Sequence, residues 1–199
     1  MKEKQRLELK GWKSTWIHVG VDKHRKERVK QWNILKTLYD IKEEIPVALD
    51  IGCGAFGGMS LAVNAKKWIL LDPLMNEYRK MYKSNKPHRY INAFGESMPL
   101  DKDSVDVVFS TNTLDHTDRP VLCLKEIYRV MKPGGYFYLW TSCRTKEHLD
   151  VKHPHMFKLK TLSKWLKDIG FEIVNEDKVT PTDKRWNTHY LTYMGVARK

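Results

Sequence analysis

Cysteine is scarce in this chain of 199 residues, and long apolar runs are absent. The three cysteines, Cys53, Cys123 and Cys143, are scattered and form no CxxC pair, which excludes a disulfide framework and a cysteine-rich zinc site. No stretch approaches the roughly 20 consecutive apolar residues of a membrane-spanning helix, and the first residues lack the apolar block of a secretion signal. We therefore expect reduced thiols, no membrane partner and a cytoplasmic location.

Internal repeats, low-complexity tracts and linkers rich in proline and serine are also missing, which excludes solenoids and strings of linked domains. Apolar residues make up 41% of the chain and charged residues 30%, as in ordered globular proteins. A chain of this length usually folds as one domain with a sizeable core. We therefore expect a single domain over residues 1–199.

Positive charge is in excess, because 36 Lys and Arg against 24 Asp and Glu give a net charge of +12. The segments 1–45, 46–143 and 144–199 each hold 12 basic residues, against 7, 10 and 7 acidic ones, so the surplus lies in the flanks. Such a surface attracts anions such as nucleic acid, phosphorylated substrates or acidic glycans. A solvated, lysine-rich surface explains the same charge, and both interpretations stay open.

Glycine and proline separate strand-like from helix-like segments, and this alternation predicts an α/β fold with helices on both faces of the sheet. Strands are expected near 47–51, 68–71, 89–93, 105–110, 136–141, 171–174 and 190–197. Helices are expected near 26–41, 60–65, 75–84, 120–131 and 162–169. Residues 1–45 would form a helical lead-in that covers a ligand as a lid, and residues 46–199 would form the core.

The chemistry starts at a glycine-rich turn after the first expected strand. Gly52, Gly54 and Gly57 satisfy G-x-G-x-x-G, and glycines at the carboxyl end of a strand let a ligand approach the backbone. Asp72 follows Gly52 by 20 residues, which suits a ribose diol, although it could instead cap a helix. Asp50 would repel a pyrophosphate and attract an ammonium group, which favours S-adenosylmethionine over a dinucleotide. Its structural alternative is to tie down the backbone of the turn.

Five short motifs follow one another along the middle of the chain. They are VALDIGCG at 47–54, LLDP at 70–73, GESMPL at 95–100, SVDVVFSTNTLDH at 104–116 and EIYRVMKPGG at 126–135. In these motifs and their order the chain resembles the class I S-adenosylmethionine-dependent methyltransferases, of the type 11 kind. The resemblance implies a doubly wound, Rossmann-like sheet of seven strands in the order 3-2-1-4-5-7-6, with the last strand antiparallel. It also implies S-adenosylmethionine as cofactor and S-adenosylhomocysteine as product.

The resemblance further implies which residues bind the cofactor. They are Asp50, Gly52, Cys53, Gly54, Asp72, Pro73, Leu74, Gly95, Glu96 and Asn112. By this likeness Asp50, Gly52 and Gly54 would border the methionine end, and Asp72 would bind the ribose hydroxyls. Many relatives carry an acidic residue where this chain has Phe94, so the contact with the adenine amino group would be apolar or made by the backbone.

Three histidines are candidates for the acceptor side of the site. His116 lies just past the fourth expected strand and is the candidate base, since imidazole accepts protons near neutral pH. Its structural alternative is to cap the following loop, and methyl transfer needs alignment more than a base. His153 and His155 are candidates for contact with the acceptor or for a structural turn. An HxH pair also suits zinc or copper, but no third ligand is evident, so no metal is expected.

We therefore expect a methyltransferase that acts on a small-molecule or glycan-type acceptor. The basic charge keeps a nucleic-acid methyltransferase, acting on RNA, as an alternative. Against it, the chain reads NTLD at 112–115, where relatives that methylate base amino groups usually carry an Asn-Pro-Pro-Tyr-like stretch. A catalytically silent cofactor-binding subunit is another alternative, and the glycine pattern alone would also fit an oxidoreductase. The identity of the acceptor and the oligomeric state stay open.

Overall fold

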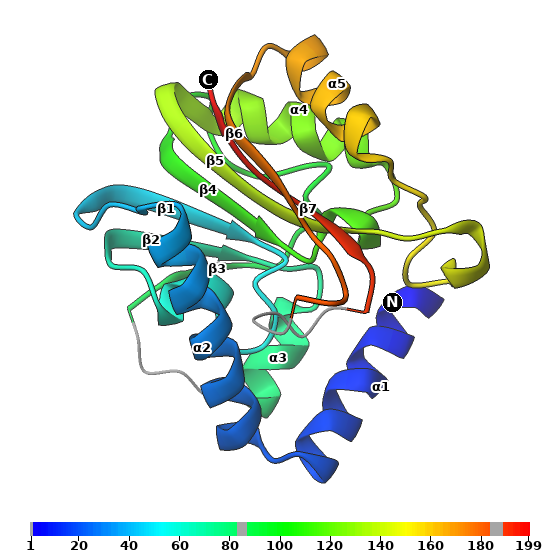
Figure 1. Cartoon of the computed structure of the whole chain (residues 1–199). Coiled ribbons are helices and arrows are strands. Elements are labelled where there is room, and N and C mark those ends of the chain that lie inside the picture. The colour runs from blue at the N-terminus through cyan, green and yellow to red at the C-terminus, as the bar shows by residue number, and fades with distance from the viewer. Residues whose placement is uncertain (1, 83–86, 184–188) are drawn as a thin grey trace.

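A seven-stranded sheet forms the centre of the computed structural model, which describes residues 2–82, 87–183 and 189–199 (Figure 1). The strand order is β3-β2-β1-β4-β5-β7-β6. Neighbouring strands from β3 to β5 are parallel, whereas β7 runs antiparallel to β5 and β6. The strands are β1 (Ile45–Ile51), β2 (Ala65–Leu71), β3 (Arg89–Ile91), β4 (Val105–Thr111), β5 (Met131–Cys143), β6 (Glu172–Val179) and β7 (Leu191–Arg198). The expected order and the antiparallel last strand are confirmed.

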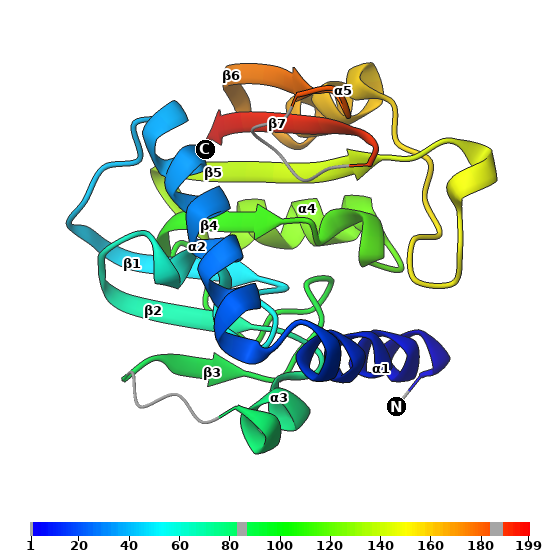
Figure 2. The same ribbon diagram turned by 60° about the horizontal axis from the view of Figure 1, so that its bottom comes forward.

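Helices lie on both faces of the sheet, as expected (Figures 1 and 2). They are α1 (Glu3–His18), α2 (Val21–Leu38), α3 (Met75–Met81), α4 (Pro120–Val130) and α5 (Leu159–Ile169), with 3-10 turns η1 (Gly58–Leu61), η2 (Leu114–His116) and η3 (Lys146–His148). On one face, Leu124 of α4 and Leu162 of α5 are buried in a core with Phe137. On the other, Trp32 of α2 is buried with Phe109. Within the described ranges, no helix has the length and apolar character needed to cross a membrane.

The segment at 60–65 differs from its prediction, because it contains only the 3-10 turn η1 and no α-helix. Gly57 and Gly58 have φ values of 89° and 49°, and this left-handed pair turns the chain sharply before η1. Asp50 Oδ2 then accepts the N–H of Met59 at 2.6 Å, which fixes the turn. Since Ala65 already pairs with β1, too few residues remain for helical turns. The predicted helix is therefore wrong.

Other elements are present, with shifted ends. α2 begins five residues before the expected helix, after Gly20 with φ 83°. β5 begins at Met131, which pairs with Val105, rather than at 136. β6 extends to Val179, because pairing with β7 continues along its exposed residues. α3 ends at Met81, and the end of the expected range 75–84 lies outside the described residues.

Candidate active site

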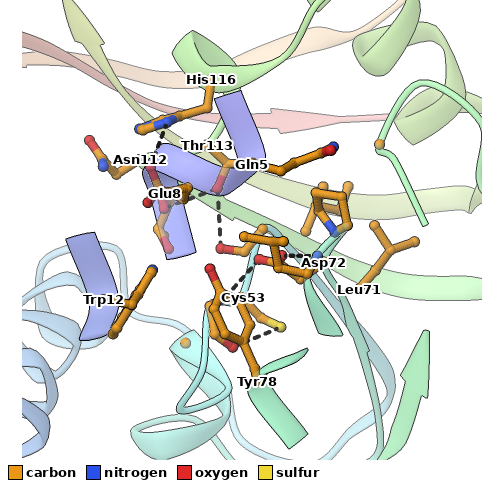
Figure 3. Close-up of a pocket in the computed structure, with 18 of the residues that line it drawn as sticks. Gln5, Glu8, Trp12, Cys53, Leu71, Asp72, Tyr78, Asn112, Thr113 and His116 are labelled. Atoms are coloured by element: carbon orange, nitrogen blue, oxygen red, sulfur yellow. Dashed lines mark hydrogen bonds and ion pairs between the residues drawn. The ribbon is translucent and has the colours of Figure 1, made fainter. Parts of the chain in front are cut away.

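A cavity of about 360 Å³ lies at the carboxyl ends of β1, β2 and β4. Its wall comes from the turns after these strands and from α1 and α2 (Figure 3). Open α/β sheets bind ligands at this edge, and the volume is in the range of small-molecule sites. The predicted cofactor residues in the wall are Gly52, Cys53, Gly54, Asp72, Pro73, Leu74, Gly95, Glu96 and Asn112. The structure thus brings nine of the ten predicted cofactor residues to one cavity.

The glycine turn is needed for close approaches of protein as well as of ligand. Gly52 and Gly54 have φ values of 64° and 63°, in the left-handed region. A Cβ on Gly52 would overlap with the side chain of Thr113, which follows β4, and a Cβ on Gly54 would lie 2.9 Å from the ring of Trp12 in α1. Glycine therefore lets the turn fit between the end of β4 and α1.

Asp72 ties the turn after β1 to the start of α3. Its Oδ2 accepts the N–H of Gly54 at 3.1 Å, and its Oδ1 accepts the N–H of Leu74 at 2.8 Å. Burial raises its pKa to about 6, so it is largely ionised at neutral pH. Each carboxylate oxygen keeps a free lone pair for a further hydrogen bond. Asp72 is not the N-cap of α3, which is Leu74 without a side-chain cap, but it bonds two backbone N–H groups beside that helix. Its contact with the ribose stays a prediction.

Asp50 is the predicted cofactor residue that the structure does not bring to the cavity wall. Its side chain is fully buried behind the turn, where a Cβ on Gly58 would overlap with Oδ2. Its Oδ1 has no hydrogen-bond partner among the described residues. Burial raises its pKa to about 8, so the group is mostly protonated at neutral pH. Its bond to the N–H of Met59 confirms that Asp50 ties down the backbone of the turn. Its contact with the cofactor stays a prediction.

Gly95 and Glu96 follow β3 and lie against the amino-terminal part of α4 and the residues just before it. Glu96 Oε1 accepts the N–H groups of Asp118 at 2.7 Å and Arg119 at 3.2 Å, just before α4 begins. A Cβ on Gly95 would lie 2.8 Å from the sulfur of Cys123 in α4. The neighbouring Phe94 lines the cavity and is 40% exposed, so an apolar surface is available there.

Asn112 reaches the wall because its backbone is left-handed, with φ 55°. Its N–H donates to the carbonyl of Trp140 at 2.7 Å, and Oδ1 accepts the hydroxyl of Ser142 at 3.4 Å. β5 thus holds this residue by both its backbone and its side chain. Asn112 is exposed in the cavity wall, and its predicted contact with the cofactor stays a prediction.

His116, on η2, lies in the wall opposite α1. Its Nδ1 is 3.9 Å from Oε2 of Glu8, and the close-up shows both side chains at the same end of the cavity (Figure 3). Burial lowers the pKa of His116 to about 4, so the imidazole is neutral at physiological pH. A neutral imidazole next to a cavity can accept a hydrogen bond or a proton.

His153 and His155 lie outside the cavity wall. The His153 ring packs edge-on against His116, with centroids 4.2 Å apart, and its Nδ1 donates to Asp150 at 2.8 Å. His155 Nε2 donates to the carbonyl of Thr117 at 2.8 Å. The structure therefore brings His153 behind His116 and uses His155 to hold the chain after η2. Direct contact of either with an acceptor stays a prediction.

Asp115 is the ligand-type neighbour of these histidines that the sequence did not reveal. Asp115, His116 and His153 each place one possible ligand atom within 4.8 Å of the others. Asp115 Oδ2 lies 3.7 Å from Nε of Arg144, and Oδ1 accepts the hydroxyl of Thr141 at 3.3 Å. The guanidinium already supplies positive charge beside the carboxylate. The expectation of no metal stays a prediction, tested below.

The sequence predicted that the amino-terminal stretch, with Trp12 and His24, covers the ligand, and both residues line the cavity, whereas Glu8 and Arg28 were not singled out. From α1 come Glu8 and Trp12, one helical turn apart, and from α2 come His24, Arg28 and Trp32, again one turn apart. Their four-residue spacing puts each set on one helix face. That spacing was the available signal for the faces themselves, and the predicted lid already implied that this stretch lies near the glycine turn.

The comparisons with known proteins agree with this geometry. Residues 49–139 match a family model described as a methyltransferase domain. The chain is 27% identical over 164 residues to 24-methylenesterol C-methyltransferase 2 of Arabidopsis thaliana, an alignment that covers 70% of this chain and 45% of that protein. It is 26% identical over 197 residues to sterol 24-C-methyltransferase of Debaryomyces hansenii, an alignment that covers 83% of this chain and 51% of that protein. The chain thus spans about half the length of the curated relatives it matches.

A solved structure shows the same fold over the whole domain. A chain from the complex between the Haloferax volcanii Trm112 methyltransferase activator and a methyltransferase aligns with a TM-score of 0.69 and 19% identity. The alignment covers 92% of this chain and 96% of that chain. Sheet order, cavity position and glycine turn define a Rossmann-like domain of the nucleotide-binding kind. Together with the methyltransferase-domain match over residues 49–139, these features make the chain similar to the class I S-adenosylmethionine-dependent methyltransferases, and this similarity implies S-adenosylmethionine as the cofactor.

Proposed function

We propose that this chain transfers the methyl group of S-adenosylmethionine to a small-molecule acceptor held in the same cavity. The observation that supports it best is the arrangement of one continuous cavity. The motif-bearing turns form one end, His116 stands at the other, and α1 contributes Glu8 and Trp12 to the wall between them. A helix across the site leaves room for a small acceptor rather than for a folded macromolecule.

The wall residues fit the cofactor in charge and shape. S-adenosylmethionine carries a sulfonium, an ammonium and a carboxylate, so it has a net positive charge. The acids Glu8, Asp72 and Glu96 line the cavity and suit such a ligand. Asp72 would accept the ribose hydroxyls, and the apolar surface of Leu74 and Phe94 would take the adenine. When bound, the cofactor supplies a methyl group activated by its sulfonium.

The acceptor end provides orientation and a proton acceptor. In methyl transfer the acceptor forms a bond to the methyl carbon while the carbon–sulfur bond breaks, and its electron pair stays on sulfur. A hydroxyl becomes strongly acidic as it gains the methyl group, so even an imidazole with a low pKa can take its proton. His116 would accept that proton, and His153, held by Asp150, would keep its ring in place. With α1 in the cavity wall, access of water to the reacting atoms would be limited.

The curated relatives favour a small organic acceptor over a glycan. Their names specify sterols, and the name of a further relative from Rattus norvegicus, 29% identical over 127 residues, specifies a thiol. The cavity wall here includes Trp12, Trp32, Phe56, Leu61 and Leu71, which are apolar. Trp12 and Phe56 lie at the glycine turn, so this lining describes the cavity as a whole, and the choice of a small organic acceptor rests on the names of the relatives.

The cofactor part of the proposal is tested by calorimetric titration of S-adenosylhomocysteine into the wild type. The variant Asp72→Asn keeps an oxygen for one backbone N–H but loses the charge, and we expect at least about tenfold weaker binding. Asp168→Ala removes an exposed carboxylate on α5 and is the matched control, with unchanged affinity. A folded wild type that fails to bind S-adenosylhomocysteine would refute the proposal.

The acceptor part is tested by release of S-adenosylhomocysteine across thiols, phenols and sterols. We expect turnover with at least one of these classes. The charge of +12 makes RNA the second acceptor to include, and RNA binding that falls steeply with salt, followed by turnover, would replace the small-molecule proposal. Turnover only after an activator protein is added would identify a subunit that is silent by itself.

A further inference from the structure

α2 contributes to the cavity wall a guanidinium that no described carboxylate neutralises. Arg28 lines the cavity, and its Nη1 donates to the neutral Oε1 of Gln31 at 3.2 Å. Among the described residues, no carboxylate oxygen lies within 4.0 Å of its nitrogens. By contrast, Lys2 and Lys4, which also line the cavity, both pair with Asp118, at 2.7 and 3.1 Å. The cavity thus holds an arginine that forms no ion pair with any described carboxylate, and Glu27, next to it in sequence, offsets the effect of its burial only in part.

The guanidinium stays charged although it is partly withdrawn from water. Burial lowers the pKa of Arg28, but arginine does not lose its proton at any physiological pH. A charge that is removed from water without a partner is costly, and proteins usually compensate it with an ion pair or a ligand. The free N–H groups of Arg28 therefore favour an anion from outside the chain.

The position of Arg28 on α2 places it beside the glycine turn. His24, one turn earlier, has its ring 5.8 Å from that of Phe56 in the turn and 5.5 Å from that of Trp12. Trp32, one turn later, packs edge-on against Trp140 of β5, with centroids 5.7 Å apart. All three α2 residues line the cavity. Arg28 thus lies between the contact with the turn and the contact with β5.

Lys152 is the other lysine or arginine of the cavity wall without an ion pair among the described residues. It lies near His116, at the end of the cavity away from the glycine turn. Its charge helps to lower the pKa of His116, so it stands at the acceptor end. The acids of the wall, Glu8, Asp72 and Glu96, suit hydroxyls and positive groups rather than an anion. Arg28 is therefore the wall cation placed at the turn that would hold the methionine end.

We propose that Arg28 binds the α-carboxylate of the cofactor's amino-acid end and thereby positions the cofactor. This inference rests on the proposed function, since it needs that cofactor in the cavity. The planar fork of arginine matches a carboxylate through two parallel hydrogen bonds, which fixes orientation as well as charge. The carboxylate is also the cofactor's one anionic group. Arg28 acts as a binding and positioning residue and takes no part in bond breaking.

The test compares two ligands that differ only in that carboxylate. S-adenosylmethionine and decarboxylated S-adenosylmethionine are titrated into the wild type, Arg28→Ala, Arg28→Lys and the control Lys30→Ala, which removes an exposed cation of the same helix. We expect Arg28→Ala to weaken S-adenosylmethionine about ten- to hundredfold and the decarboxylated ligand by less than about twofold. Arg28→Lys should fall between, because a point charge replaces the fork.

Three outcomes would overturn the inference. Equal affinity of wild type and Arg28→Ala for S-adenosylmethionine would show that Arg28 does not bind the carboxylate. Equal losses for both ligands, with a lower melting temperature, would assign it a structural role. A folded wild type that binds neither ligand would remove the proposed function itself, which separates that failure from the first two.

Discussion

The two ends of the cavity are built in different ways. At the cofactor end, short turns after β1 and β2 are held by backbone N–H groups bonded to Asp72, and glycine lets them approach their neighbours. At the acceptor end, side chains far apart in sequence meet, as Glu8 of α1 does with His116 of η2. At the first end the backbone is held by hydrogen bonds to Asp72, whereas the second end depends on how separate segments pack. The same cavity would therefore combine a cofactor site built on strand-end turns with an acceptor site that is set by the packing of side chains from separate segments.

The largest effect is expected where the backbone itself is changed at the cofactor end. Gly52→Ala puts a Cβ into Thr113 at a left-handed φ, and we expect a loss of about 2–4 kcal/mol in the free energy of unfolding. Binding of S-adenosylhomocysteine should fall below detection. Thermal denaturation and calorimetry measure the two effects.

The matched control is Gly134→Ala, which has a similar φ of 76° with nothing near the added Cβ. It should cost only the backbone strain, about 1 kcal/mol, and leave ligand affinity unchanged. Similar effects from both variants would mean that strain, and not the approach of Thr113, requires glycine at 52. The contrast between the two ends would then lose its basis.

A smaller effect is expected where α1 meets the glycine turn. The Trp12 ring makes edge contacts with His24, Phe56 and Tyr78 at centroid distances of 5.5 to 5.8 Å. Trp12→Ala should weaken S-adenosylhomocysteine binding on the order of tenfold and speed proteolytic cleavage within α1. Trp12→Phe should retain most of the affinity for S-adenosylhomocysteine and most of the resistance of α1 to cleavage. Cleavage of α1 at the same rate with and without ligand would contradict the predicted lid.

The sequence predicted the fold, the strand-end turns and an amino-terminal lid, but not which side chains of α1 and α2 line the cavity. The strands are short apolar runs bounded by glycine or proline, so their signals are local. The failure at 60–65 came from Gly57, Gly58 and the bond from Met59 to Asp50, which joins residues in different elements. Arg28 has no such local signal, because its meaning depends on α2 lying beside the turn.

A pH-dependent effect is expected at Asp50, behind the cofactor end. Burial raises its folded pKa to about 8, so the folded state binds more protons than the unfolded state from pH 4 to pH 8. Stability therefore falls as pH rises through this range. Asp50→Asn keeps an oxygen for Met59 and has no charge to bury. Its melting temperature relative to wild type should rise between pH 6 and pH 9, and a constant difference would contradict a protonated Asp50.

No effect is expected from chelators at the acceptor end. The guanidinium of Arg144 lies beside the carboxylate of Asp115. The negative charge in the group of Asp115, His116 and His153 is therefore compensated without a metal ion. Treatment with EDTA should leave methyl transfer and melting temperature unchanged. Loss of activity that zinc or manganese restores would make these residues a metal site, and the acceptor end would then be fixed by coordination.

The ion pairs of Lys2 and Lys4 with Asp118 bear on how quickly product leaves. They fasten the first turn of α1 through groups near the surface, whereas Trp12 holds its other half through apolar contacts. Exposed ion pairs are weakened by salt, and apolar contacts are not. Opening should then begin at the amino-terminal end of α1 and swing about Trp12. The residence time of S-adenosylhomocysteine would then shorten as ionic strength rises. The rate of product release would therefore depend on salt through the position of α1.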